Sequence, residues 1–165
     1  MTTPADETSR GEGTRADLKL ERFIPYRVAV IADWLSESLA STYKQRFGIT
    51  IPEWRILAVL SRFQPLSATE VGELSNMDKP RVSRALSRMT RADLIARRQD
   101  ANDQRVAVLR LTQRGQALYR EIEPLALEWE RSLLEGLDDA ERETLSQLLA
   151  KLQHRASEMR SHLRE

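Results

Sequence analysis

Cysteine is absent from this chain of 165 residues, and histidine occurs only twice. The missing thiols exclude disulfide bonds, thiolate nucleophiles and cysteine-based redox sensing. The two histidines, His154 and His162, have no carboxylate–histidine pattern around them, so we interpret them as structural or solvated; a metal ligand is the alternative. Because the sequence also lacks a Gly-rich phosphate loop and the H-E-x-x-H and G-x-S-x-G patterns, we expect no enzyme, no metal and no cofactor.

Long apolar runs are missing as well. No segment approaches the length of a membrane span, and the chain shows no signal-peptide pattern at its start. Hydrophobic residues make up 41% of the sequence and charged residues 31%, which is typical of a globular protein. We therefore expect one domain, or a small domain with an appendage, in the cytoplasm.

The net charge of +1 says little about a partner, but the distribution of charge says more. Residues 79–105 carry eight basic and three acidic side chains, a surplus of five positive charges. Residues 121–143 carry nine acids against two arginines. A polyanion would be attracted to the first region and repelled by the second.

The basic region contains a predicted helix over residues 78–94, DKPRVSRALSRMTRADL. Asp78 is a good N-cap, and Pro80 suits the first turn. Apolar residues recur on one face and arginines on another, with small hydroxyls beside them (apolar: Val82, Ala85, Leu86, Met89; basic: Arg81, Arg84, Arg88, Arg91; hydroxyl: Ser83, Ser87). Such a helix suits the major groove of DNA, although a merely solvated charged face is the alternative.

The flanking segments favour DNA binding. Residues 66–77 predict a preceding short helix, in which Ser67 and Glu70 form a capping box and Val71 and Leu74 are apolar positions. After the basic helix, residues 94–98 and 106–111 predict two strands joined by a turn at residues 100–103. The order is that of a helix-turn-helix followed by a hairpin, or wing.

This run resembles the winged helix-turn-helix of the MarR (multiple antibiotic resistance regulator) family. The wing pattern of that family, D-x-R, five residues and then L-T-x-x-G, is present in full (Asp103, Arg105, Leu111, Thr112, Gly115). The resemblance extends from about Leu20 to Leu163. It implies a third, very short strand near Leu66 and Ser67.

Two sets of DNA contacts are expected. Arg81, Ser83 and Arg84 lie where recognition helices reach base edges, while Lys79, Ser87 and Arg88 suit phosphates. The resemblance implies that Arg105 of the wing enters the minor groove, oriented by Asp103. Arg97 and Arg98 would support phosphate binding.

Long helices are predicted on both sides of this motif. Residues 18–47 have near-heptad apolar spacing, with Pro25 marking a kink or the true start, and a helix over 53–63 follows. Residues 112–137, ended by Gly136, and a last helix begun at Asp138 or Asp139 close the chain. The expected fold is mainly α (α+β): a disordered tail (1–17), an N-terminal dimerisation helix (18–47), a winged helix-turn-helix (48–111) and C-terminal dimerisation helices (112–165).

The resemblance also implies a ligand crevice for small aromatic or phenolic anions. Aromatic and arginine side chains that would suit an aromatic carboxylate or its thioester are available (Tyr26, Arg27, Trp34, Trp54, Arg55). The alternative is that the tryptophans are core residues and the arginines are surface or paired.

We therefore predict a homodimeric repressor that binds double-stranded DNA at a palindromic operator and responds to such an effector, with no membrane partner. The alternatives are a winged-helix protein-interaction module without DNA binding and a small helical enzyme.

Overall fold

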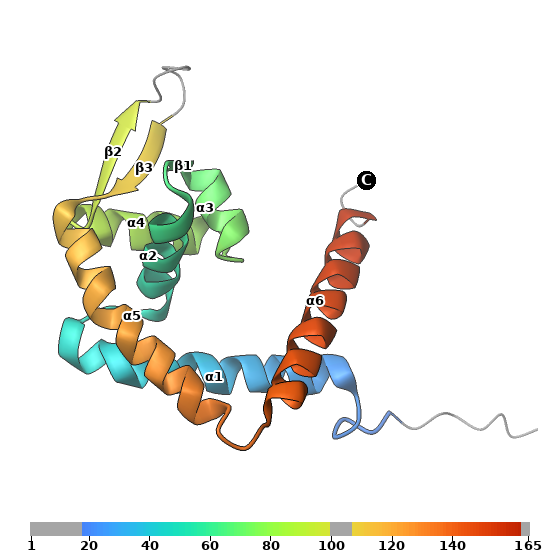
Figure 1. Cartoon of the computed structure of the whole chain (residues 1–165). Helices are drawn as coiled ribbons and strands as arrows, with labels where there is room; N and C mark the ends of the chain where they lie inside the picture. The colour runs from blue at the N-terminus through green and yellow to red at the C-terminus, as the bar shows by residue number, and fades with distance from the viewer. Residues whose placement is uncertain (1–17, 100–106, 163–165) are drawn as a thin grey trace, which may run out of the picture. The chain divides into compact units, whose positions relative to one another are not determined.

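A computed structural model describes residues 18–99 and 107–162. The tail predicted over 1–17, the wing residues Asp103 and Arg105, and Leu163 lie outside these ranges. The elements follow one another as the helix-turn-helix pattern predicts (Figure 1): α1 (Ile24–Phe47), α2 (Ile51–Phe63), β1 (Leu66–Ser67), α3 (Ala68–Leu74), α4 (Lys79–Arg91), β2 (Ile95–Gln99), β3 (Ala107–Leu111), α5 (Gln113–Leu133) and α6 (Asp139–His162).

The three strands form one antiparallel sheet in the order β1-β3-β2. Ile95 pairs with Leu111 at the base of the hairpin, and Leu66 of the two-residue β1 pairs with Leu109 on the other edge of β3. The mainly helical winged fold, including the short third strand, is confirmed.

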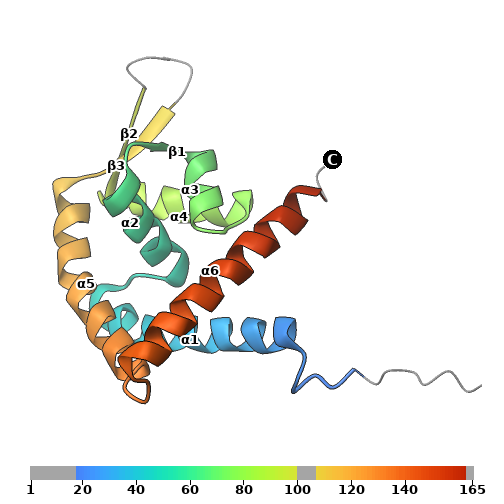
Figure 2. The same ribbon diagram turned by 45° about the vertical axis from the view of Figure 1, so that its right-hand side comes forward.

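The core lies where α2 meets the helix-turn-helix. Ile56, Leu57 and Leu60 of α2 are fully buried, and α3 and α4 pack beside α2 and the sheet in both ribbon views (Figures 1 and 2). Val71 of α3 is also buried, but Leu74, predicted as its second apolar contact, is half exposed. Leu74 is the last residue of α3 and is not part of the core.

Local side-chain caps set the helix starts of the motif. Ser67 accepts a hydrogen bond from the Glu70 N–H at 3.2 Å, and the Glu70 carboxylate accepts from the Ser67 N–H at 2.7 Å. The predicted capping box is confirmed. The backbone bond from Ser67, together with the side-chain bond, holds the pKa of Glu70 below its ordinary value.

Gly115 lets α5 pack closely on the start of the wing. A Cβ atom at this position would lie 2.0 Å from the carbonyl oxygen of Leu94. Thr112 strengthens the junction, because its N–H donates to Leu94 O at 3.1 Å and its hydroxyl donates to Asp93 O at 2.6 Å. This gives a physical reason for the L-T-x-x-G pattern: the hydroxyl joins the helix to the wing, and only glycine permits the approach.

The chain divides into two compact units, residues 1–35 and 36–165. In the first unit the helix begins at Ile24 and not at Leu18, with Pro25 in its first turn. The alternative in which Pro25 marks the true start is therefore confirmed. Large apolar side chains of this unit are exposed, including Val28, Ile31 and Trp34.

In the second unit, the start of α2 and the end of α5 differ from the predicted boundaries. α2 begins at Ile51, two residues before the predicted start, because Pro52 is accepted in the first turn. α5 ends at Leu133 and not at Gly136, and it runs through Pro124 without interruption. α6 begins after Asp138, whose carboxylate accepts from the Glu141 N–H at 2.8 Å, as predicted.

The apolar residues of α6 form an exposed row, with between 38% and 57% of each residue accessible (Leu145, Leu148, Leu149, Leu152, Met159). None of the helices that the structure describes is both long and apolar enough to cross a membrane.

Candidate nucleic-acid interface

The basic helix α4 is fixed at its start by the aspartate that the sequence pattern identified. The Asp78 carboxylate accepts from the Arg81 N–H at 2.7 Å, which satisfies a donor that the first turn leaves unpaired. Val82, Ala85 and Met89 are buried. The opposite face therefore points to solvent, as the helical period requires.

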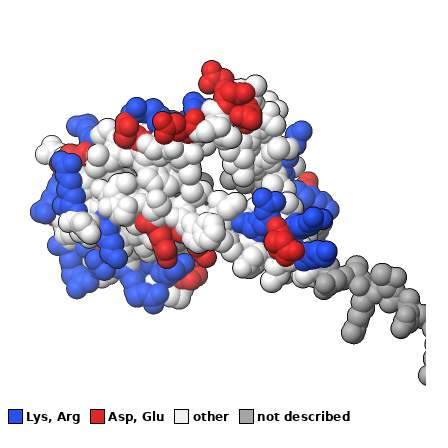
Figure 3. Space-filling view, turned by 90° about the horizontal axis from the view of Figure 1, so that it is seen from below, with Lys and Arg blue, Asp and Glu red and all other residues white. Residues whose placement is uncertain are grey.

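Every DNA-contact residue predicted on α4 and β2 is exposed (Lys79, Arg81, Ser83, Arg84, Ser87, Arg88, Arg97, Arg98). Figure 3 views the molecule from below Figure 1, at the end opposite the wing, and other Lys and Arg side chains gather along its left and lower-left edge.

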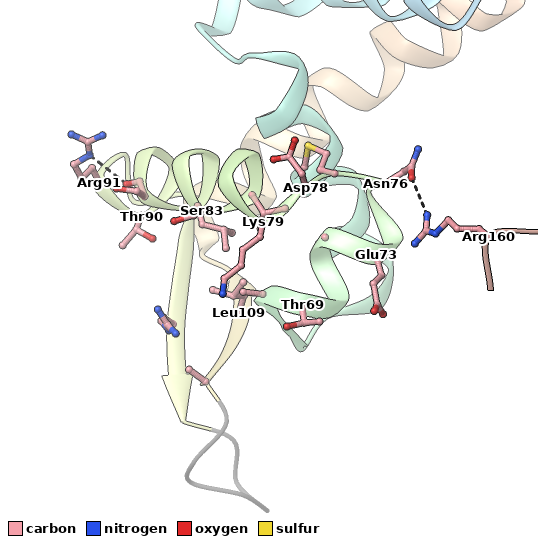
Figure 4. A pocket seen from close by; sticks show the side chains of 18 residues that line it. Thr69, Glu73, Asn76, Asp78, Lys79, Ser83, Thr90, Arg91, Leu109 and Arg160 are labelled. Atoms are coloured by element: carbon pink, nitrogen blue, oxygen red, sulfur yellow. Dashed lines mark hydrogen bonds between the residues drawn. The ribbon is translucent and has the colours of Figure 1, made fainter. Parts of the chain in front are cut away.

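A hollow of about 1000 Å³ lies between α3, α4 and the two wing strands, and Arg160 of α6 also lines it, donating to Asn76 Oδ1 at 3.4 Å (Figure 4). Lys79, Ser83 and Ser87 of α4 line it, together with Arg97 of β2. Successive strand residues point to opposite faces, so Arg98 does not share the hollow with Arg97. The structure thus brings four predicted contacts into one concave surface.

Arg81, Arg84 and Arg88 do not line the hollow. Each residue advances about 100° around a helix, which places these arginines on the outer and α2-facing sides of α4. Arg88 in addition forms an ion pair, with its Nε 3.0 Å from Oε1 of Glu53 on α2. The predicted contacts therefore occupy two surfaces of one helix and not a single row.

Thr69 of α3, and Thr90 and Arg91 of α4, line the same hollow but were not among the predicted contacts. The sequence contains no periodic signal that links Thr69 to α4, because the two lie on different helices. Arg91 was recognisable from the helical spacing of the arginines.

The predicted ligand residues fall in both units. Tyr26, Arg27 and Trp34 belong to residues 1–35 and are exposed. Trp54 and Arg55 belong to the second unit. There the Trp54 ring lies 5.5 Å from the Tyr43 ring and stacks on Tyr119 at 6.0 Å between centroids.

Arg55 lies at the edge of this aromatic cluster. Its Nη2 donates to Ser36 Oγ at 3.2 Å, and among the described residues no carboxylate forms an ion pair with it. Burial raises the pKa of Tyr43 to about 12, and the nearby charge of Arg55 partly opposes that rise. Trp54 is thus a packed aromatic residue, while Arg55 has no carboxylate partner among the described residues.

A cluster of metal-ligating side chains has no counterpart in the described ranges. Within residues 18–99 and 107–162, no group of three His, Asp or Glu side chains could hold a metal ion. His154 is exposed and lies 3.4 Å from Glu158.

Comparison with known proteins agrees with this geometry. The MarR family model matches residues 47–106. A MarR/EmrR family transcriptional regulator from Acinetobacter sp. ADP1 is 30% identical to this chain, with a TM-score of 0.79. That match covers 86% of this chain and 99% of the Acinetobacter chain. This protein belongs to the MarR family.

Two further proteins are similar to this chain over most of its length. The HTH-type transcriptional regulator YwoH of Bacillus subtilis is 28% identical over 109 residues, which is 66% of this chain and 79% of YwoH. BpsR of Bordetella bronchiseptica, whose DNA binding is regulated by 6-hydroxynicotinic acid, shares the fold with a TM-score of 0.74 at 23% identity, over 83% of this chain and 97% of BpsR. The chain is a DNA-binding transcriptional regulator of the MarR family and not an enzyme.

Proposed function

We propose that this MarR-family regulator is a homodimeric repressor of a palindromic operator, released by a small aromatic acid or its thioester. The observation that carries the proposal is the exposed surface made by α4 and the wing. Serine and threonine hydroxyls line its hollow and arginines flank it, so base edges and phosphates are both within reach of one element.

The exposed apolar row on α6 supports the proposed dimer. A row of five large side chains, each more than a third exposed, is unfavourable in water. A second copy of the chain would bury it and present two recognition helices to one duplex. Two half-sites about 10 base pairs apart are then expected.

The effector proposal rests on Arg55 and the aromatic cluster. A guanidinium without a carboxylate partner next to stacked rings suits an aromatic carboxylate, since the charge and the ring faces recognise the two halves of the ligand. The regulation of BpsR by 6-hydroxynicotinic acid supports the same ligand chemistry. The contribution of Tyr26, Arg27 and Trp34 stays a prediction.

The function can be tested by selecting bound duplexes from a random-sequence pool and measuring affinity across a salt series. A regulator of this kind should enrich an inverted repeat, resist nonspecific competitor and bind more weakly as salt rises. Aromatic acids and their thioesters would then be screened for release of the selected duplex. Recovery of sequences without a common repeat would refute the operator proposal.

The wing can be tested separately with Arg105→Ala. The family resemblance implies that this arginine enters the minor groove. If its contact is worth about 1–3 kcal/mol, as a specific arginine–base contact is, its loss should weaken operator binding about 5- to 150-fold. Sedimentation should show an unchanged oligomeric state. Binding as tight as that of the parent protein would show that the wing assignment is wrong.

A further inference from the structure

Glu53 connects the start of α2 with the recognition helix. Among the residues that the structure describes, it is the only charged side chain that is buried, with 4% of the residue exposed. Its Oε2 accepts hydrogen bonds from the N–H and hydroxyl of Thr50, at 2.8 and 2.6 Å. Its Oε1 lies 3.0 Å from Nε of Arg88. One carboxylate oxygen therefore accepts hydrogen bonds at the start of α2, and the other forms an ion pair with α4.

The chemistry of this pair determines how Arg88 is held. A buried carboxylate is costly unless it has a cation and hydrogen-bond donors, and Arg88 is the cation that the structure supplies. The ion pair is made through Nε, without a hydrogen bond between the two side chains. The guanidinium has four further N–H donors, on its two terminal nitrogens, and the Arg88 side chain is 53% exposed. The ion pair thus holds Nε of Arg88 next to Glu53. The two terminal nitrogens, which form the outer edge of the guanidinium, are left to solvent.

The place of Arg88 on α4 makes this outer edge relevant to DNA. Arg88 follows Arg84 by one helical turn and Arg81 by two, on the side of α4 away from the hollow. Two parallel N–H donors of a guanidinium match two oxygens of one phosphate. A side chain already held in place loses less conformational freedom on binding than a free one.

We propose that Glu53 is a positioning residue of the DNA interface, which holds Nε of Arg88 so that the terminal nitrogens bind an operator phosphate. This inference rests on the proposed function, because it requires a DNA complex. Glu53 does not touch DNA in this arrangement. It acts through Arg88.

Glu53→Gln is the sharpest perturbation, because glutamine keeps the size and an oxygen for Thr50 but removes the charge that orients Arg88. The variant should bind the operator about 2- to 10-fold more weakly, the cost of ordering one long side chain on binding. Arg88→Ala should bind more weakly still, and its slope of log affinity against log salt should fall by about 0.9, one phosphate contact. Glu53→Gln should lower the slope in the same direction.

The double variant decides the mechanism. Without Arg88 there is nothing for Glu53 to position, so Glu53→Gln combined with Arg88→Ala should bind as Arg88→Ala does. Arg84→Ala is the matched control, since no ion pair with Glu53 is recorded for Arg84. In the double variant of Glu53→Gln and Arg84→Ala, the two fold-losses in operator affinity should multiply. Thermal unfolding would establish that each variant is folded.

Three outcomes would overturn the inference while the operator proposal stands. In the first, Glu53→Gln binds the operator as tightly as the parent protein or more tightly. In the second, its affinity falls but the slope of log affinity against log salt is unchanged, as expected if Glu53 only holds α2 and α4 together. In the third, Glu53→Gln weakens binding by the same factor after Arg88 is removed. Failure of the parent protein to bind any selected duplex would overturn both proposals.

Discussion

Substitution of Gly115 by alanine tests the junction that positions the wing. The added Cβ would lie 2.0 Å from the carbonyl oxygen and 3.0 Å from the carbonyl carbon of Leu94. Ordinary C···O contacts are about 3.3–3.6 Å long, so the start of α5 must move away from the sheet by more than about 1 Å. The neighbour is backbone, which cannot turn aside as a flexible side chain can.

The expected loss of stability combines three contributions. Overpacking costs about 1–3 kcal/mol. The bonds from Thr112 to Leu94 O and Asp93 O are weakened by the same movement, and each contributes about 0.5–1.5 kcal/mol. Alanine recovers up to about 1 kcal/mol of helix propensity. The net destabilisation should be about 3 kcal/mol.

Urea unfolding followed by circular dichroism, at one fixed protein concentration, measures this loss. Gly136→Ala is the matched control, because a Cβ there meets no atom within 4 Å and should change stability by less than about 0.5 kcal/mol. If Gly115→Ala is as stable as Gly136→Ala, the close approach of α5 to the wing does not exist in solution.

Two further predictions concern the recognition helix and the aromatic cluster. Asp78→Ala removes the cap of α4 and should lower the free energy of unfolding in urea by about 1 kcal/mol, whereas Asp78→Ser should keep most of that stability. Equal stability of the parent protein and both variants would show that the cap contributes nothing. The buried phenol of Tyr43 stays protonated to about pH 12, while in the unfolded chain it ionises near 10. Its contribution to stability is therefore complete below pH 10 and declines as pH rises from 10 to 12. Tyr43→Phe should reduce this alkaline loss in pH-dependent unfolding, and an unchanged pH profile would contradict the burial of the phenol.

Several features of the fold were predictable because their causes are local. Asp78 and Ser67 cap helices through contacts within four residues, and the apolar period of residues 82–89 selects the buried face of α4. Boundaries were less accurate. Pro52 can occupy the first turn of a helix or precede it, so the start of α2 was open. Gly136 lies three residues beyond the true end of α5. Composition alone could not place either boundary.

The sequence by itself determined the order of elements, the basic character of α4 and the arginines available to DNA, since helical and strand periods depend only on neighbours along the chain. Tertiary structure alone decided which of these side chains share a surface. Thr69 reaches the hollow of α4 because two helices pack together, and Arg88 meets Glu53 across 35 residues of chain. Such pairings depend on how elements pack in space, which no local period encodes.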